Sequence, residues 1–125
     1  MNNIVEIQQT EDSPRILLNE DNSLFLIEGP SFPEDAFSSY TPVIDWLKKV
    51  TSKFDNELKC TFKFKVVSSA SHKMLYETLT FLEKLYDSGT NISIHWYYEE
   101  LDEDMFEIGE DFSEALSIPF VFHKL

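Results

Sequence analysis

The stretch that decides the fold is LKCTFKFKVVSSASHKMLYETLTFLEKLYDSGTNISIHWYY, which runs from Leu58 to Tyr98. Its first ten residues alternate between apolar side chains and lysine or threonine, a pattern typical of a strand with one buried face. Residues 71–86 carry apolar side chains at helical spacing, and Gly89 follows as a C-terminal cap. Ile92–Tyr98 alternates again. The stretch therefore predicts a strand, a helix and a second strand parallel to the first.

The alternation also predicts which side chains each strand buries, because successive residues of a strand point to opposite faces. One face should pack on the core, and the other should contact water or a partner. On the first strand we expect Cys60, Phe62, Phe64 and Val66 to be buried, with Lys59, Thr61, Lys63 and Lys65 on the open face. On the second strand Ile92, Ile94, Trp96 and Tyr98 should share one side, with His95 on the other.

The segment before this unit predicts a hairpin followed by an irregular loop. Ile4–Ile7 is a possible short first strand, and Arg15–Leu18 and Ser23–Glu28 flank the turn residues Asn19–Asn22. The next segment, Gly29–Asp35, has too many helix and strand breakers for a regular element. It predicts a shaped loop.

Apolar stripes predict further helices on both sides of the central unit. One helix should follow Thr41 as its cap, with Pro42 in the first position. Another should cover about Asp102–Leu116 and be stopped by Pro119, before a last strand at Phe120–Lys124. The stripes are Val43, Trp46, Leu47, Val50 and Phe54; Leu75, Thr78, Leu79, Leu82, Leu85 and Tyr86; and Leu101, Met105, Ile108, Phe112 and Ala115 or Leu116.

This order of elements indicates an α/β fold formed by one domain over residues 1–125. Strands separated by single helices are parallel neighbours, and the leading hairpin adds antiparallel pairing. We therefore expect a mixed sheet with about three helices packed mainly on one face. The lysines on the open side of Leu58–Val67 agree with a sheet that is covered on one side only.

The charge excludes several classes of partner. Ten basic and 23 acidic residues give a net charge of −13, which disfavours nucleic acid and anionic membranes. No signal peptide or membrane-spanning run is visible, and Cys60, the one cysteine, has no disulfide partner. We therefore expect a cytoplasmic protein.

No residue pattern predicts catalysis, a metal or a cofactor. Glu99–Glu114 holds nine acidic residues and no basic one, which indicates either a solvated helix face or a docking surface for a basic partner. His72, His95 and His123 lie far apart in the sequence and lack a zinc-ligand spacing. His72 follows Ser71 directly, but sequence adjacency does not place a base on a nucleophile. We predict that the chain is not an enzyme.

Ser68-Ser69-Ala70-Ser71, between the first strand and its helix, has two explanations. Serine is a favoured N-cap, because its hydroxyl accepts a hydrogen bond from a free N–H of the first turn. The same place suits a phosphoryl group, because the helix dipole stabilises an anion there. Composition alone leaves both explanations open.

An ordered set of motifs resembles the SiaC family of bacterial regulatory phosphoproteins, from about Ser13 to Phe122. The motifs are Ser13-Pro14-Arg15-Ile16, the loop Gly29–Asp35, Val43-Ile44-Asp45-Trp46, the serine cluster with Lys73, His95-Trp96-Tyr97-Tyr98 and Ile118-Pro119-Phe120. The resemblance implies a fold similar to anti-sigma-factor antagonists, the STAS type. It also implies a protein that is the substrate of a protein kinase and a PP2C-like phosphatase. The unphosphorylated form would bind and activate a diguanylate cyclase, and so promote cyclic-di-GMP synthesis and biofilm growth.

The resemblance also implies the phosphorylation site. The family's phosphorylated threonine lies in an Asn-Thr-Ser-Ser segment, and counting back from Trp96 without a gap places Ser69 on that threonine. Ser68 falls on the asparagine, Ser71 on the last serine and Lys73 on the family's lysine. Ser69 is thus the expected acceptor, with Ser68 and Ser71 as runners-up, and Lys73 could pair with the phosphate. Serine in place of threonine keeps the hydroxyl but changes the group offered to a kinase.

The expected partner surface joins the serine cluster to the preceding loop. It consists of Ser31, Phe32, Pro33, Glu34, Asp35, Ser68, Ser69, Ser71 and Lys73. Two functions remain open: a phosphorylation-controlled switch, and a constitutive protein-binding domain of the same fold that is never phosphorylated.

Overall fold

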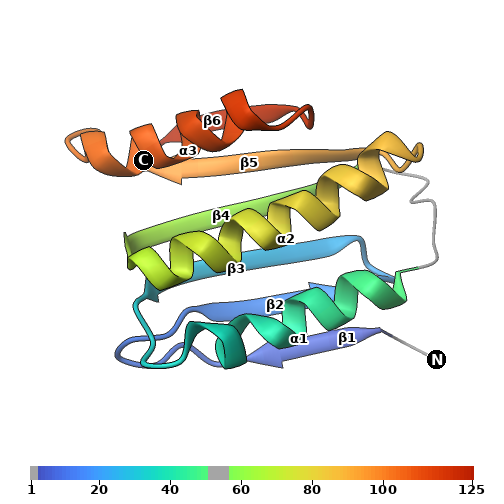
Figure 1. The fold of residues 1–125 in the computed structure, drawn as a ribbon, viewed down its shortest axis with the longest axis horizontal. Coiled ribbons are helices and arrows are strands. Elements are labelled where there is room, and N and C mark those ends of the chain that lie inside the picture. Colours follow the sequence, from blue (N-terminus) through green and yellow to red (C-terminus); the bar gives the residue numbers. More distant parts are fainter. Residues whose placement is uncertain (1–2, 51–56) are drawn as a thin grey trace.

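Helices and strands follow one another in the order that the sequence predicts (Figure 1). The structure is a computed structural model that describes residues 3–50 and 57–125. The elements are β1 (Ile4–Ile7), β2 (Arg15–Asn19), β3 (Leu24–Ser31), α1 (Ala36–Lys49), β4 (Leu58–Val67), α2 (Ser69–Asp87), β5 (Ile92–Tyr98), α3 (Glu103–Ala115) and β6 (Phe120–Lys124).

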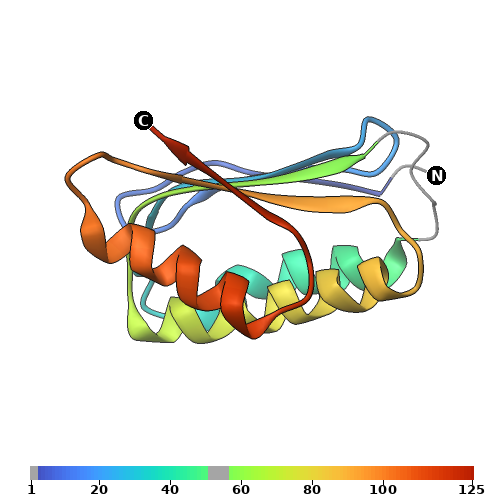
Figure 2. The same cartoon turned by 90° about the horizontal axis from the view of Figure 1, so that it is seen from above.

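The described strands form one mixed six-stranded sheet in the order β1-β2-β3-β4-β5-β6. The pairs β1–β2 and β2–β3 are antiparallel, and β3 to β6 run parallel. All three described helices lie on the same face of this sheet, and no helix of the described residues covers the opposite face (Figure 2). The predicted fold class is therefore confirmed.

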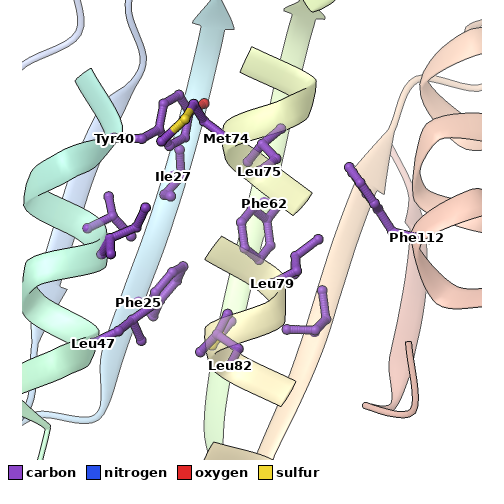
Figure 3. Close-up of a cluster of buried hydrophobic side chains, with 14 of the residues drawn as sticks. Phe25, Ile27, Tyr40, Leu47, Phe62, Met74, Leu75, Leu79, Leu82 and Phe112 are labelled. Carbon is purple, nitrogen blue, oxygen red and sulfur yellow. The ribbon is translucent and has the colours of Figure 1, made fainter. Parts of the chain in front are cut away.

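The core lies between the sheet and the helices (Figure 3). Phe62 of β4 is fully buried, with its ring centroid 5.6 Å from that of Phe25 and 5.9 Å from that of Trp96. Leu75 and Leu79 of α2 pack in the same cluster. Burial of each such side chain stabilises the fold by about 2–3 kcal/mol. The alternating residues of the strands and the apolar stripes of the helices therefore belong to one core.

The predicted faces of β4 and β5 are confirmed in the part that crosses the core. Cys60, Phe62 and Phe64 are buried, whereas Lys59 and Lys65 are exposed. Lys63 lies on the open face with its Nζ 4.5 Å from the ring centroid of Tyr97. The end of the strand departs from the prediction, because Lys65 has no partner where the register with β3 shifts. Alternation restarts after this extra residue, so Val66 is exposed and Val67 packs against the core instead.

Helix α1 begins earlier than predicted. Its N-cap is Asp35, whose carboxylate accepts a hydrogen bond from the Ser38 N–H at 3.1 Å, and Pro42 lies inside the helix. An interior proline removes one backbone hydrogen bond. Burial of Ala36 and Tyr40 in the core offsets that loss, so tertiary packing outweighs the local preference for proline at a helix start. The predicted stripe residue Phe54 lies outside the described residues.

Two other local predictions were wrong. Gly29–Ser31 is not loop but the end of β3, which continues past a register shift between Gly29 and Pro30. Gly29 has φ +107°, a value that favours glycine, and the shift accommodates a proline that cannot donate to the ladder. Leu101, placed on the α3 stripe, is 93% exposed, since it precedes the N-cap Asp102 and lies outside the helix.

Candidate functional site

The serine cluster and the segment after β3 meet at one edge of the sheet. Because β3, β4 and β5 are parallel, their carboxyl ends lie together, on the left of Figure 1. The Ser68 N–H donates to the Ser31 carbonyl at 2.9 Å, which joins the end of β3 to the start of α2. This contact joins two segments that lie about forty residues apart in the sequence, one ending β3 at Ser31 and the other beginning α2 with the serine cluster. Together the two segments form one surface.

Ser69 is the exposed serine of the cluster, whereas Ser68 is partly buried. Helix α2 begins at Ser69, two residues earlier than predicted, and Ser68 is its N-cap, accepting the Ser71 N–H at 3.1 Å. Ser69 and Lys73 are both exposed and stand four residues apart, so they share one helix face. A hollow of about 230 Å³ beside them is lined by Val67, Ser68, Ser69 and His72. Ser69, the expected acceptor, is thus accessible to solvent.

Ser71 and Ser31, in contrast, are fully buried. The Ser31 hydroxyl donates to Ser71 Oγ at 2.8 Å and lies 2.6 Å from the Tyr40 hydroxyl. Burial raises the pKa of Tyr40 to about 12, against the opposing effect of the two serine hydroxyls. Ser71, a runner-up phosphoacceptor, is therefore disfavoured because a kinase cannot reach its hydroxyl. Ser31 was expected on the partner surface, but its buried side chain cannot contact a partner. Instead, the Ser31 hydroxyl links the end of β3 to Tyr40 of α1 and to Ser71 of α2.

The rest of the predicted partner surface is largely exposed. Phe32, Glu34 and Asp35 are exposed, and Pro33 is partly buried. The Ser38 hydrogen bonds lower the pKa of the Asp35 carboxyl, which keeps the N-cap of α1 ionised. Apolar side chains of this edge also reach the solvent. They are Phe32, Phe37, Val66, Leu101 and Leu125, of which Phe37 is 67% exposed.

Sequence spacing missed a histidine pair on the open face of the sheet. Parallel pairing of β5 with β6 brings His95 Nδ1 to 2.7 Å from His123 Nε2, although the two residues lie far apart in the sequence. His123 also stacks on Tyr97, with centroids 4.4 Å apart. Burial, and then His123 and Lys59, lower the pKa of His95. Register alone created this contact, so no local signal could have revealed it.

The described residues hold no group of three or more side chains suited to a metal. The residues 3–50 and 57–125 likewise include no helix that is both long and apolar enough to cross a bilayer. The candidate site consists of the exposed Ser69 and nearby exposed apolar side chains. The buried hydroxyl groups of Ser31, Tyr40 and Ser71 lie beneath it and hold its segments together.

Two solved crystal structures contain chains with the same fold as this protein. A chain of the crystal structure of the diguanylate cyclase SiaD in complex with its activator SiaC, from Pseudomonas aeruginosa, matches with a TM-score of 0.89 and 24% identity. The match covers 97% of this chain and 99% of that one. The crystal structure of apo-SiaC from the same organism matches with a TM-score of 0.87 and 24% identity, over 96% and 98% of the two chains.

Sequence comparison agrees over nearly the whole chain. An uncharacterized protein of Pseudomonas aeruginosa (strain UCBPP-PA14) is 26% identical over 116 residues, which cover 93% of this chain and 92% of that protein. The family model described as "SiaC family regulatory phosphoprotein" matches residues 7–125. That description is of a regulator and not of an enzyme, as the sequence predicts. This chain belongs to the SiaC family of regulatory phosphoproteins.

Proposed function

We propose that this protein is a phosphorylation-controlled partner switch whose unphosphorylated form binds and activates a diguanylate cyclase. A protein kinase and a PP2C-like phosphatase would set its state at Ser69. Family membership and a fold shared with SiaC, an activator bound to the cyclase SiaD in its crystal structure, support this proposal. The observation that carries it is the exposure of Ser69 at the start of α2, beside Ser31 and Phe32 at the end of β3.

The position allows a phosphate to be added without damage to the fold. Ser69 is the first residue of α2, where the free N–H groups and the helix dipole stabilise an anion. The cap itself is supplied by Ser68, so modification of Ser69 leaves the Ser68–Ser71 hydrogen bond in place. Lys73, one turn later on the same face, would pair with the phosphate.

The same phosphate would disrupt a protein contact. It adds about −1.5 to −2 charges, at an edge where Phe32 and Val66 expose apolar surface. A partner that covers these side chains would desolvate the phosphate, and an unpaired charge in an interface costs several kcal/mol. The free hydroxyl carries no such penalty, so the unphosphorylated form would be the binding form.

Titration calorimetry of the full chain against the diguanylate cyclase encoded nearest to its gene tests the proposal. The three forms to compare are the wild type, Ser69→Ala and a chain with phosphoserine incorporated at position 69. We expect Ser69→Ala to bind as the wild type does. The phosphoserine form should bind about a hundredfold more weakly, which corresponds to roughly 3 kcal/mol.

Ser88→Glu is the matched control, because it adds a charge to an exposed serine at the opposite end of the same helix. It should leave the affinity unchanged. Equal affinity of the phosphorylated and unphosphorylated chains would overturn the switch and favour the constitutive binding domain. Absence of binding by every form would reject the cyclase as the partner.

A further inference from the structure

A groove lies between α3 and the last strand, on the C-terminal side of the sheet. It has a volume of about 540 Å³ and is lined by the aromatic rings of Tyr98 and Phe106 and by four glutamates, Glu100, Glu103, Glu107 and Glu110. The two rings are 4.9 Å apart, and the ring of Phe106 is 5.4 Å from that of Phe122 on β6. The groove thus combines an apolar surface with acidic walls.

The groove is open because the last strand is only partly covered. β6 is the terminal strand of the described sheet, so no described strand pairs with its outer edge. Helix α3 packs mainly on β4 and β5, which leaves Phe120 and Phe122 partly exposed. Alternate backbone groups of β6 therefore point away from β5, beside half-exposed aromatic rings. An unprotected edge of this kind can pair with an added strand.

The charges around the groove specify the chemistry of its occupant. Lys124 is the one cation among the described residues that line the groove. Its Nζ lies 3.6 Å from Glu100 Oε1, so an ammonium group already occupies part of the acidic wall. Glu103, Glu107 and Glu110 have no ion pair with another described residue at this wall. We propose that the groove binds an extended, basic segment of a partner protein, which pairs with β6 through its backbone and places lysine or arginine side chains against these glutamates.

The proposed contact is separate from the phosphorylation switch. None of the groove residues belongs to the hollow at Ser69, and the expected interaction depends on negative charge that is always present. A basic segment bound here would hold a partner in either state of Ser69. The two proposals can therefore fail independently.

Fluorescence anisotropy with a labelled peptide of alternating lysine and valine residues tests the groove on the full chain. We expect Glu107→Gln/Glu110→Gln to weaken binding about tenfold, since each exposed charge pair contributes a few-fold to the affinity. Asp45→Asn/Glu77→Gln removes the same charge from exposed positions of α1 and α2 and should change the affinity less than about twofold. In heteronuclear spectra the peptide should shift the amide signals of β6.

Three results would overturn the proposal. Equal weakening by both double variants would mean that the peptide responds to net charge and not to the groove. A peptide with alternate backbone nitrogens methylated, at unchanged charge, should lose binding, and unchanged binding would reject strand pairing. Sedimentation that shows self-association of the unliganded chain, abolished by the Glu107 and Glu110 substitutions, would assign the groove to a second copy instead.

Discussion

The hydroxyl of Ser31 donates to that of Ser71 at 2.8 Å, across forty positions of sequence, within a fully buried site. This contact separates the serines of the cluster into two roles. Ser71 turns into the core and holds α2 to β3, whereas Ser69 turns outward at the first position of the same helix. Ser69 is therefore accessible to a modifying enzyme, whereas Ser71 is not.

Ser71→Asp should destabilise the protein by more than about 3 kcal/mol, because a carboxylate would be buried without a cationic partner. Ser69→Asp should leave the stability unchanged or raise it by up to about 1 kcal/mol, since an anion in the first turn suits the helix dipole. Urea denaturation of the two variants measures the difference. Similar losses at both positions would contradict the division of roles.

Under the proposed function, Ser69→Thr should be phosphorylated at least as fast as the wild type by the kinase that modifies Ser69, since the resemblance to the SiaC family implies a threonine at this position. The added methyl group would lie in solvent, because Ser69 is exposed, so the substitution should not disturb the fold. Intact-mass and fragment-ion analysis after incubation with the kinase gives the site and the rate. Ser69→Ala is the control, and phosphate on Ser68 in that variant would move the acceptor by one residue.

Gly109→Ala should destabilise the protein by about 2 kcal/mol, although alanine usually favours a helix over glycine by about 1 kcal/mol. A Cβ at this position of α3 would lie 2.4 Å from Trp96 Cδ1. The indole cannot move freely, because it is buried and its Nε1–H donates to the Met105 carbonyl at 2.9 Å. Thermal denaturation shows whether Gly109→Ala lowers or raises the stability. Ser113→Ala on the same helix is the control, and it should leave the stability unchanged or raise it.

The histidine pair should make stability depend on pH. Burial, His123 and Lys59 lower the pKa of His95, so below about pH 6.5 the unfolded chain binds more protons at this residue than the folded chain. The contribution of neutral His95 to the free energy of unfolding is therefore complete above about pH 6.5. It is lost as the pH falls through the lowered pKa that His95 has in the folded protein. Between about pH 7.5 and pH 5.5 the melting temperature of His95→Gln should fall less than that of the wild type.

Thr61→Val provides the control for that measurement. Thr61 lies opposite His95 on β4, and its substitution changes the open face without adding or removing a titratable group. It should keep the pH dependence of the wild type. If the slopes of the wild type and of His95→Gln coincide, the pair does not contribute to the pH dependence.

Much of the fold could be predicted from the sequence because its patterns are local. β1, β4, β5 and β6 have the predicted bounds, since strict alternation and flanking turn residues are properties of a few neighbouring side chains. The start of α1 could not be predicted in the same way. Pro42 favours a helix start in isolation, but burial of Tyr40 in the core extends the helix to Ala36.

The sequence by itself determined the alternation, the helical stripes, the charge and the ordered motifs, and these sufficed for a mixed α/β fold and a family resemblance. The tertiary structure decided which serine faces the solvent, which histidines meet, and where the sheet leaves an edge and a face open. These facts depend on strand order and register, which bring residues as distant as Ser31 and Ser71 to hydrogen-bonding distance. No local pattern records such a contact, because its energy comes from packing the two segments together.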